Sequence, residues 1–413
     1  MAAILIISAL DLWSLGDEKG APSLSRTVTG YLERGFQVHF ITGSQRAPGA
    51  GIAHPQLGVS RLDVAILKRF FGRRVIGRFA KTVWWIWFQA ASFLLALAIR
   101  RRHGGVDVVY GYEIAGVPVA KALSMLWRIP CVSRFQGTTL SDWLKRSRWP
   151  IRLWDHILAL RIRADLVIMT NDGTRGDRVL ERLGVDPSRV RFWMNGVDAD
   201  LLERVPDRNE SRRALGIPDV PMLLTVSRLV PWKRVERCIE AMPRVLESVP
   251  GALLVIVGDG NARSDLEALA NRLGLREGVR FTGAIAHSDV PAYYAAADLF
   301  VSTYDLSNVG NPLLEALASG TCCVALATGD TERVVADGQT GVLVQPDRLS
   351  ELPMTLVDLL ENPVKRERLG KNARRFARAS FWSWEERIGR EVDEVERLIA
   401  SPGGSLRLTE GVG

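Results

Sequence analysis

The sequence predicts an α/β protein with two doubly wound domains, each a parallel sheet covered by helices. Its 413 residues exceed one typical domain, and two domains of about 200 residues each are the natural expectation. Short apolar β-type runs alternate with helical patterns along the chain, which is typical of parallel sheets buried on both faces. Residues 198–221 are polar, contain prolines and divide these runs into two sets, so we interpret them as a linker. Ligands are then expected at the carboxyl ends of the strands, in the cleft.

Twelve β-type runs define the expected sheets, six in each half of the chain. The expected strands of the first half are residues 2–8, 37–42, 106–111, 131–135, 165–170 and 190–193. Those of the second half are residues 222–227, 253–260, 279–283, 298–303, 322–327 and 341–345. The apolar start has no basic segment before it and no small-residue cleavage site after it. We therefore interpret it as the first strand rather than as a signal peptide.

Two helices are visible in the spacing of apolar residues. The first follows Lys233, and its apolar positions recur at spacings of four and three: Val235, Ile239, Met242, Leu246 and Val249. This spacing is typical of an amphipathic helix packed on a sheet. The second occupies residues 381–400, with an apolar stripe of Trp382, Trp384, Ile388, Val392, Val395 and Ile399. We expect this stripe to dock across the domain boundary.

The charge is divided unevenly between the two halves. Residues 1–200 hold 28 Lys and Arg against 16 Asp and Glu, whereas residues 201–413 hold 26 against 30. The net charges of +12 and −4 give the overall +8. This asymmetry suggests an anionic partner for the first half. Neither metal spacing nor a disulfide framework is visible among the cysteines, which we expect to be buried thiols in a reducing compartment: Cys131, Cys238, Cys322 and Cys323.

Residues 68–102 combine basic clusters with tryptophans and long aliphatic runs. The uncharged stretch 82–99 is 18 residues long and includes Gln89 and Ser92, which is borderline for a spanning helix. An interfacial helix with snorkelling Arg and Lys fits better, and part of it is expected to pack on the first sheet. The basic stretch 143–154 also contains tryptophans. No nucleic-acid reading module is recognisable, so we expect an anionic membrane surface and no nucleic acid as partner.

Residues 305–320 are the most informative segment. Their turn formers are Asn308, Gly310 and Asn311, and the next residue is Pro312, a type preferred at the first helical position. A helix that begins there points its unpaired N–H groups and its positive dipole end at a preceding phosphate. Glu315 is expected in the first turn, where its carboxylate reaches polar groups of the same ligand. The segment therefore predicts a site for an anionic, hydroxyl-rich ligand such as a nucleotide sugar.

A series of motifs in the second half follows a recognisable order. They are residues 226–242, 255–260, 279–283, 293–302, 311–320 and 336–344, and residues 35–42, 106–111 and 195–198 fit more loosely. This series resembles the retaining family 4 glycosyltransferases. The resemblance implies a GT-B fold, in which two Rossmann-like domains face a central cleft and a C-terminal helix crosses back to the first domain. The implied divisions are 1–203 (acceptor side), 204–380 (nucleotide-sugar binding) and 381–413 (returning helix and frayed tail).

Arg228 and Lys233 follow an expected strand and flank the start of a helix. Chemistry and resemblance together imply catalytic cations that grip the donor diphosphate, and solvated surface charge is the alternative. Glu315 is similar to the second Glu of the family motif E-x7-E, which contacts ribose hydroxyls. The loop 12–26 resembles the family's Gly-rich loop and is not a G-x-G-x-x-G fingerprint, which disfavours a nicotinamide dehydrogenase. The other implied donor-binding residues are Gly16, Gly20, Gly258, Ser307, Asn308, Val309, Gly310, Asn311 and Leu314.

The chain departs from the family pattern at two positions near the reacting centre. Ser307 stands where the first Glu of the motif is expected, and it carries no charge. Asp305, two positions away, is the candidate catalytic carboxylate, and Asn308 and the backbone of 309–310 are alternatives. Gln136 stands where family members often have a His, and an amide cannot act as a general base. The leaving phosphate oxygen can take the acceptor proton instead.

The acceptor side is expected in the first domain. Its candidate residues are Glu113, Arg134 and Gln136, for which an ordinary structural role is the alternative. Asp198 and Asp200 spell D-x-D, a metal signature of a different glycosyltransferase architecture, but they lie at a turn. We interpret them as turn and helix-capping residues and expect neither metal nor cofactor.

These observations predict a cytoplasmic enzyme on the cytoplasmic face of the membrane. We expect it to be a retaining glycosyltransferase that moves a sugar from a nucleotide-diphosphate sugar to a lipid-linked or polysaccharide acceptor. Two alternatives remain: a non-catalytic nucleotide-sugar-binding partner of another transferase, and a nucleotide-sugar epimerase of the same architecture.

Overall fold

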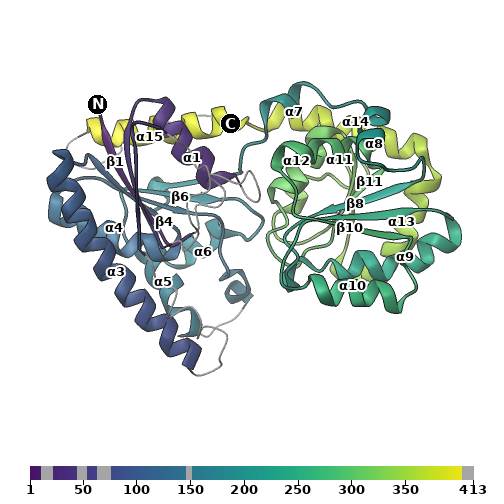
Figure 1. The fold of residues 1–413 in the computed structure, drawn as a ribbon, viewed down its shortest axis with the longest axis horizontal. Coiled ribbons are helices and arrows are strands. Elements are labelled where there is room, and N and C mark those ends of the chain that lie inside the picture. Colours follow the sequence, from purple (N-terminus) through teal and green to yellow (C-terminus); the bar gives the residue numbers. More distant parts are fainter. Residues whose placement is uncertain (11–21, 44–53, 63–75, 146–150, 402–413) are drawn as a thin grey trace.

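Two parallel sheets, each covered by helices on both faces, form the two domains of the protein (Figure 1). The computed structural model describes residues 1–10, 22–43, 54–62, 76–145 and 151–401. Within these residues the first sheet has the strand order β3-β2-β1-β4-β5-β6-β7, and the second has the order β10-β9-β8-β11-β12-β13. The order reverses beside β1 in the first sheet and beside β8 in the second. Such switch points are where doubly wound sheets bind ligands.

The strands are those that the apolar runs predict, with one addition. The first sheet contains β1 (Ala3–Ser8), β2 (Gln37–Thr42), β3 (Leu57–Arg61), β4 (Val108–Tyr112), β5 (Cys131–Phe135), β6 (Leu166–Thr170) and β7 (Val190–Trp193). The second contains β8 (Met222–Val226), β9 (Leu253–Val257), β10 (Val279–Gly283), β11 (Leu299–Ser302), β12 (Cys322–Leu326) and β13 (Val342–Val344). The sequence did not predict β3, because this edge strand reads LGVSR and is half exposed, with no apolar run to reveal it.

Helices fill both faces of each sheet. Those of the first domain are α1 (Ser23–Glu33), α3 (Ile76–His103), α4 (Glu113–Trp127), α5 (Trp154–Arg161) and α6 (Gly176–Arg182). The following helices are α7 (Ala199–Glu203), α8 (Arg208–Ala214), α9 (Glu236–Ser248), α10 (Arg263–Arg272), α11 (Val290–Ala296), α12 (Asn311–Ser319), α13 (Leu352–Glu361), α14 (Pro363–Ser380) and α15 (Trp384–Ala400). One apolar cluster lies on each face of each sheet. All four cysteines are free and buried.

Residues 198–221 are not an open linker, as the sequence suggested. They form α7 and α8, which pack on α12 and α11 of the second domain. Val197 and Leu201 belong to the apolar core of that domain. The chain therefore enters the second domain directly after Gly196. The segment is polar, as a linker would be, but its polar residues form the exposed faces of two short surface helices.

The chain crosses between the domains twice at the same place. Val197 N donates to the Trp382 carbonyl at 3.0 Å, and Trp384 N donates to the Val197 carbonyl at 3.0 Å. After this crossing α15 returns to the first sheet and lies beside α1 (Figure 1). Its apolar stripe, with Ile388 and Val392, joins the core cluster of the first domain. The predicted returning helix is confirmed.

A buried ionic group fastens α15 to the first sheet. Arg134 of β5 pairs with Glu391, and neither side chain is exposed to solvent. Glu391 also accepts from Tyr110 at 2.5 Å and from Arg387 at 3.0 Å. Arg134 donates further to Thr27 of α1 at 2.9 Å. Each side chain has at least one partner, although the buried nitrogens Nε and Nη2 of Arg134 and Nη2 of Arg387 have none, and the group ties the sheet, α1 and α15 together.

The helix α3 packs one face on the first domain and exposes the other. Phe88, Ser92 and Ala96 are fully buried, whereas Ile86 and Leu94 are 57% and 66% exposed. By length and composition, residues 80–103 are long and apolar enough to cross a membrane, with a mean hydropathy of 1.6. Residues 68–75 of the predicted membrane segment lie outside the described residues.

Candidate active site

The cationic side of the site lies in the second domain. Lys233 Nζ donates a 3.0 Å hydrogen bond to the carbonyl of Ser307 and lies 4.2 Å above the Tyr304 ring. Burial lowers the pKa of Lys233 to about 8, and Arg228 contributes to this lowering while Asp172 opposes it. The structure thus places a desolvated ammonium against the loop that precedes α12.

Arg228 and the start of α12 complete this side. The Arg228 guanidinium lies 6.0 Å over the Trp232 ring, and no carboxylate of the described residues pairs with it. Gly310 precedes α12, whose first residue is Asn311. Asn195 of the first domain donates to Asn311 Oδ1 at 2.8 Å, which fixes the helix start. The first N–H groups of a helix have no internal partners, so this end can hold an anion between two cations.

Glu315 lies deeper than the sequence suggested. It is the fifth residue of α12, so the expectation that it lies in the first turn is wrong. Its carboxylate accepts a hydrogen bond from Tyr294 at 3.1 Å, and His287 Nε2 is 3.8 Å away. Burial raises the pKa of Glu315, and His287 lowers it in part. The side chain therefore lies buried behind the helix start. It contacts the Tyr294 hydroxyl and the His287 imidazole and does not interact with the N-terminal end of the helix dipole.

Asp198 connects His287, which lies beside Glu315, to the first domain. It precedes α7, but its side chain makes no capping hydrogen bond, so the expected capping role is wrong. Instead its carboxylate accepts from Arg26 of α1 at 2.6 Å and from His287 at 3.0 Å. Burial lowers the pKa of His287, but Asp198 and Glu315 outweigh this and raise it overall. Within the described residues, no group of three or more His, Cys, Asp or Glu side chains is arranged to hold a metal.

The first domain contributes carboxylates and amides from the ends of its strands. Glu113 follows β4 with φ of +62°, a left-handed conformation that is strained for a non-glycine residue. Its Oε1 accepts the backbone N–H of Gln136 at 2.6 Å, and Gln136 Nε2 donates to the Tyr112 hydroxyl at 2.6 Å. Burial raises the pKa of Glu113 to about 7, while the hydrogen bond from Gln136 opposes this. The structure brings two of the three predicted acceptor-side residues together here.

The loop after β6 reaches across to the second domain. Asp172 is 8% exposed, and its Oδ1 accepts from the backbone N–H and the hydroxyl of Thr174 at 3.1 and 2.5 Å. The Ser307 side chain of the second domain lies close enough to lower the pKa of this carboxylate. Val309 N donates to the Asp172 carbonyl at 2.9 Å. Burial raises the pKa of Asp172, and Thr174 and Ser307 lower it in part.

Asp305 lies apart from this group. Its carboxylate pairs with Arg237 at 2.7 Å and Arg234 at 3.3 Å, and its side chain is 49% exposed. It therefore neutralises guanidinium groups at the start of α9 rather than joining Lys233. Asn308 is buried and donates to the Thr328 hydroxyl, which holds the loop from behind.

Three predicted site residues have structural positions instead. The expectation that Arg134 lines the acceptor side is wrong, because it is fully buried against Glu391. Leu314 is fully buried in the apolar core, so its side chain does not line a donor pocket. At Gly258 an added Cβ would lie 1.8 Å from the Ser227 carbonyl oxygen, so this glycine allows two strand ends to approach. Two further predicted donor residues lie outside the described residues: Gly16 and Gly20.

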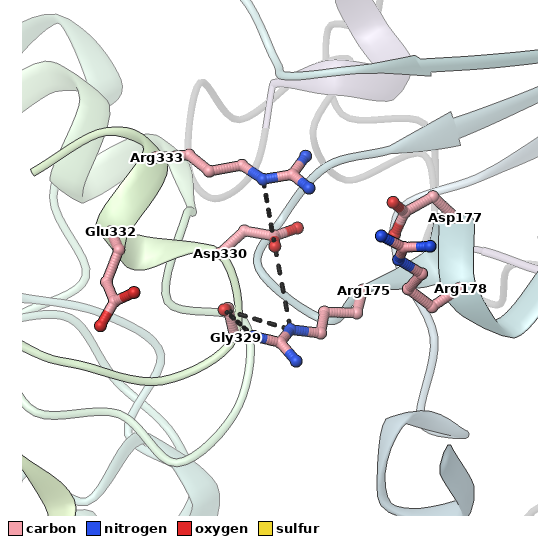
Figure 2. Close-up of a pocket in the computed structure, with 7 residues that line it drawn as sticks. All are labelled: Arg175, Asp177, Arg178, Gly329, Asp330, Glu332 and Arg333. Atoms are coloured by element: carbon pink, nitrogen blue, oxygen red, sulfur yellow. Dashed lines mark hydrogen bonds and ion pairs between the residues drawn. The ribbon is translucent and has the colours of Figure 1, made fainter.

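A charged pocket of about 220 Å³ lies where the two domains meet (Figure 2). Arg175 of the first domain donates to the Gly329 carbonyl at 3.2 and 3.0 Å and lies 3.9 Å from Asp330. Arg333 approaches Asp330 from the other side at 3.5 Å, as Figure 2 shows. The remaining lining residues are Asp177, Arg178 and Glu332. None of the predicted site residues that the structure describes lines this pocket, which acts as a second contact between the domains.

Sequence reasoning missed Asp172, although a signal for it existed. Asp172 follows the expected strand 165–170, and polar residues at the carboxyl ends of parallel strands line the cleft of doubly wound folds. Glu113 and Gln136 were selected after the two preceding strands of the same sheet. The same rule, applied to the strand that follows, would have identified Asp172.

Two family descriptions match the two halves of the chain. "Glycosyltransferase Family 4" matches residues 23–201, and "Glycosyl transferases group 1" matches residues 207–376. The solved structure of a sucrose-phosphate synthase from Thermosynechococcus elongatus aligns with a TM-score of 0.78 at 21% identity, covering 97% of this chain and 100% of that one. This agreement confirms the predicted α/β GT-B architecture.

Relatives of known activity are similar over shorter spans. A GDP-mannose-dependent alpha-(1-6)-phosphatidylinositol monomannoside mannosyltransferase of Mycolicibacterium smegmatis is 34% identical over 47% of this chain and 53% of its own length. The chain thus spans about half the length of that relative. A D-inositol 3-phosphate glycosyltransferase of Actinosynnema mirum is 34% identical over 70% of this chain and 72% of its own. Taken with the fold and the cation-flanked helix start, these matches show that the chain belongs to the family 4 glycosyltransferases of the group 1 type.

Proposed function

We propose that this protein is a retaining glycosyltransferase that moves a hexose from a nucleoside-diphosphate sugar to a lipid-linked acceptor at the cytoplasmic face of a membrane. The observation that carries the donor assignment is the position of Lys233. Its ammonium is desolvated, bonded to the Ser307 carbonyl and directed at the loop before α12. A buried cation beside a helix N-terminus is suited to a diphosphate, which needs charge and N–H donors together.

The residues around this point have complementary tasks in the proposed reaction. Arg228 and Lys233 stabilise negative charge that develops on the departing nucleoside diphosphate. Glu315, buried behind the helix start, accepts hydrogen bonds from ribose hydroxyls. The bond between the sugar C1 and the phosphate oxygen breaks, and the acceptor oxygen forms the new bond to C1. The acceptor proton passes to the departing phosphate oxygen, so Gln136 need not act as a base.

A panel of nucleotide sugars incubated with the protein and a membrane lipid extract tests this function. GDP-mannose is the first donor to try, because it is the donor named for the Mycolicibacterium relative. Transfer releases free nucleotide and forms a new glycolipid. An epimerase would form a new nucleotide sugar without free nucleotide, and a binding partner would form neither product. Either of these results would contradict the proposed transfer.

The exposed face of α3 supports the membrane part of the proposal. Large apolar side chains there are open to solvent, and the Trp85 ring meets Trp154 of α5 edge to face at 5.1 Å. The outward apolar residues of α3 and α5, which we call the apolar face, are Val83, Ile86, Trp87, Leu94, Trp154 and Leu158. Three arginines, residues 100–102, end the helix. Since Phe88 and Ala96 pack in the domain core, we infer that α3 lies in the interface and does not span.

Sedimentation with lipid vesicles tests this surface. We expect the protein to bind vesicles that contain anionic lipid and to release them as salt is raised, because basic side chains contribute electrostatically. Replacing Ile86 and Trp87 with Ser should weaken binding without lowering the melting temperature. The matched control is Met354→Ser, which removes a 50% exposed apolar side chain from α13 of the second domain. Equal binding by both variants would refute the apolar face as the contact.

A further inference from the structure

The loop before α12 has no carboxylate of its own near its reacting end. Ser307 is uncharged, and Asp305 is taken up by Arg234 and Arg237. Ser307 is nevertheless held in an unusual conformation, with φ of +60°. Its carbonyl accepts from Lys233 at 3.0 Å, and Val309, two residues further on, donates its N–H to the Asp172 carbonyl at 2.9 Å. The carboxylate that can take the place of an acidic residue at position 307 therefore comes from the first domain, from Asp172.

The first domain is shaped to deliver this carboxylate. At Gly137 an added Cβ would lie 2.4 Å from the carboxylate atoms of Asp172, so only glycine leaves room for it. At Gly173, whose φ is +90°, an added Cβ would lie 2.9 Å from Val309 N. Thr174 orients the Asp172 carboxylate through two hydrogen bonds. Two glycines thus let the segment that carries Asp172 pack closely against the loop of the other domain, and Thr174 holds its carboxylate in place.

The Asp172 carboxylate retains capacity for a ligand. An ionised carboxylate accepts about four hydrogen bonds, and two positions are used, by the Thr174 N–H and the Thr174 hydroxyl. Lys233 and Asp172 bond to the same loop, at the Ser307 carbonyl and at Val309 N, and these contacts bring Asp172 to the proposed diphosphate site. We expect the sugar of a bound donor to extend from the diphosphate toward this point. In glycosyl transfer, positive charge develops at the sugar ring, and a nearby carboxylate stabilises it.

We propose that Asp172 is the catalytic carboxylate of the sugar subsite, supplied across the cleft by the first domain in place of an acidic residue at position 307. The proposal rests on the proposed transferase function. Ser307 is then the positioning residue that keeps the carboxylate directed at the sugar. The subsite is complete only when both domains are in contact, because its carboxylate comes from the first domain and its cations come from the second.

The first experiment compares Asp172→Asn with a matched control. Asp186 has the same local geometry, since its Oδ1 accepts from the backbone N–H and hydroxyl of Ser188 two residues on, but it lies on the surface. We expect Asp172→Asn to lower kcat about 100-fold or more, with unchanged melting temperature and unchanged affinity for the free nucleoside diphosphate. Asp186→Asn should keep wild-type kcat. Wild-type kcat in Asp172→Asn, or a parallel loss of stability and nucleotide binding, would overturn the proposal.

The second experiment moves the carboxylate to the other domain. Ser307→Glu alone should be impaired, because it sets two carboxylates side by side. The double variant Asp172→Ser/Ser307→Glu restores one carboxylate and one hydroxyl, and we expect at least tenfold more activity than either single variant. A purely structural Asp172 would give no such rescue, and absence of rescue refutes the proposal. If the wild-type protein transfers no sugar from any donor, the proposed function itself fails, which is visible before any variant is made.

Discussion

The two sides of the cleft are built from opposite chemistry. The second domain presents cations and a helix N-terminus, namely Lys233, Arg228 and the start of α12. The first domain presents two part-buried or buried acids, Glu113 and Asp172, whose pKa values burial raises. The cationic surface of the second domain suits a diphosphate, and the acidic surface of the first domain suits sugar hydroxyls. In the proposed reaction the domains therefore divide the donor between them, one holding the leaving group and the other facing the group that is transferred.

The strongest way to break this comparison is to remove the cations. The double variant Arg228→Ala/Lys233→Ala should lose about 100- to 1,000-fold or more in kcat, because charge on the leaving diphosphate is then unstabilised. Steady-state release of nucleoside diphosphate measures it. Wild-type turnover in this variant would show that the second domain does not hold the leaving group.

Arg134 sharpens the boundary between cleft and core in the first domain. Arg134→Met leaves Glu391 buried near Arg387 without its main partner, and breaking such a pair costs about 3–5 kcal/mol. We expect a large drop in the free energy of unfolding, measured by chemical denaturation. The KM for the acceptor should stay at its wild-type value at a temperature where the variant is folded. A raised acceptor KM with normal stability would show that Arg134 is an acceptor-side residue after all.

Glu315 tests whether the nucleoside is held by the second domain alone. Glu315→Gln keeps the volume and the contact with Tyr294 but loses the charge that favours bonds from ribose hydroxyls. We expect the donor KM to rise about 10-fold, as for a lost hydrogen bond to a charged group, with kcat little changed. If kcat falls and the donor KM does not rise, the residue acts on the reaction rather than on the nucleoside.

The pH dependence of Lys233 is the smallest of these effects. Because the folded pKa is lowered from 10.5 to about 8, the free enzyme loses this charge as pH rises through 8. We expect kcat/KM for the donor to decline above that pH, since this parameter reports free-enzyme ionisations. In Lys233→Arg the decline should move to higher pH, because a guanidinium stays charged. An unchanged alkaline limb would assign it to another group.

The fold was predictable because buried parallel strands are recorded in the sequence as apolar runs. All twelve expected strands are present, and within the described residues the one strand that was not expected, β3, is a half-exposed edge strand with little apolar signal. The order of the motifs then predicted the family. The returning helix was predictable as well, since the stripe containing Ile388 and Val392 needed a surface to cover it.

The site was less predictable, because its key contacts join residues far apart in the sequence. Asp172 and Val309 meet only through the contact between domains, and no local pattern records that. Arg134 was misassigned for the same reason: its partner Glu391 lies 257 residues away on the returning helix. Asp305 matched the expected chemistry by type and position, but it pairs with Arg237 on α9 and with Arg234, which precedes that helix.

The paired crossing at Val197 and Ser383 has a consequence for how the domains can move. Because the two passing segments are hydrogen-bonded to each other, they form a single hinge line and not two independent tethers. Rotation about such a line would keep the domains in register, so opening would separate Asp172 from Val309 and closure would return them to the same contact. The acid therefore has a high effective concentration at the loop it serves, fixed by covalent geometry before any substrate binds.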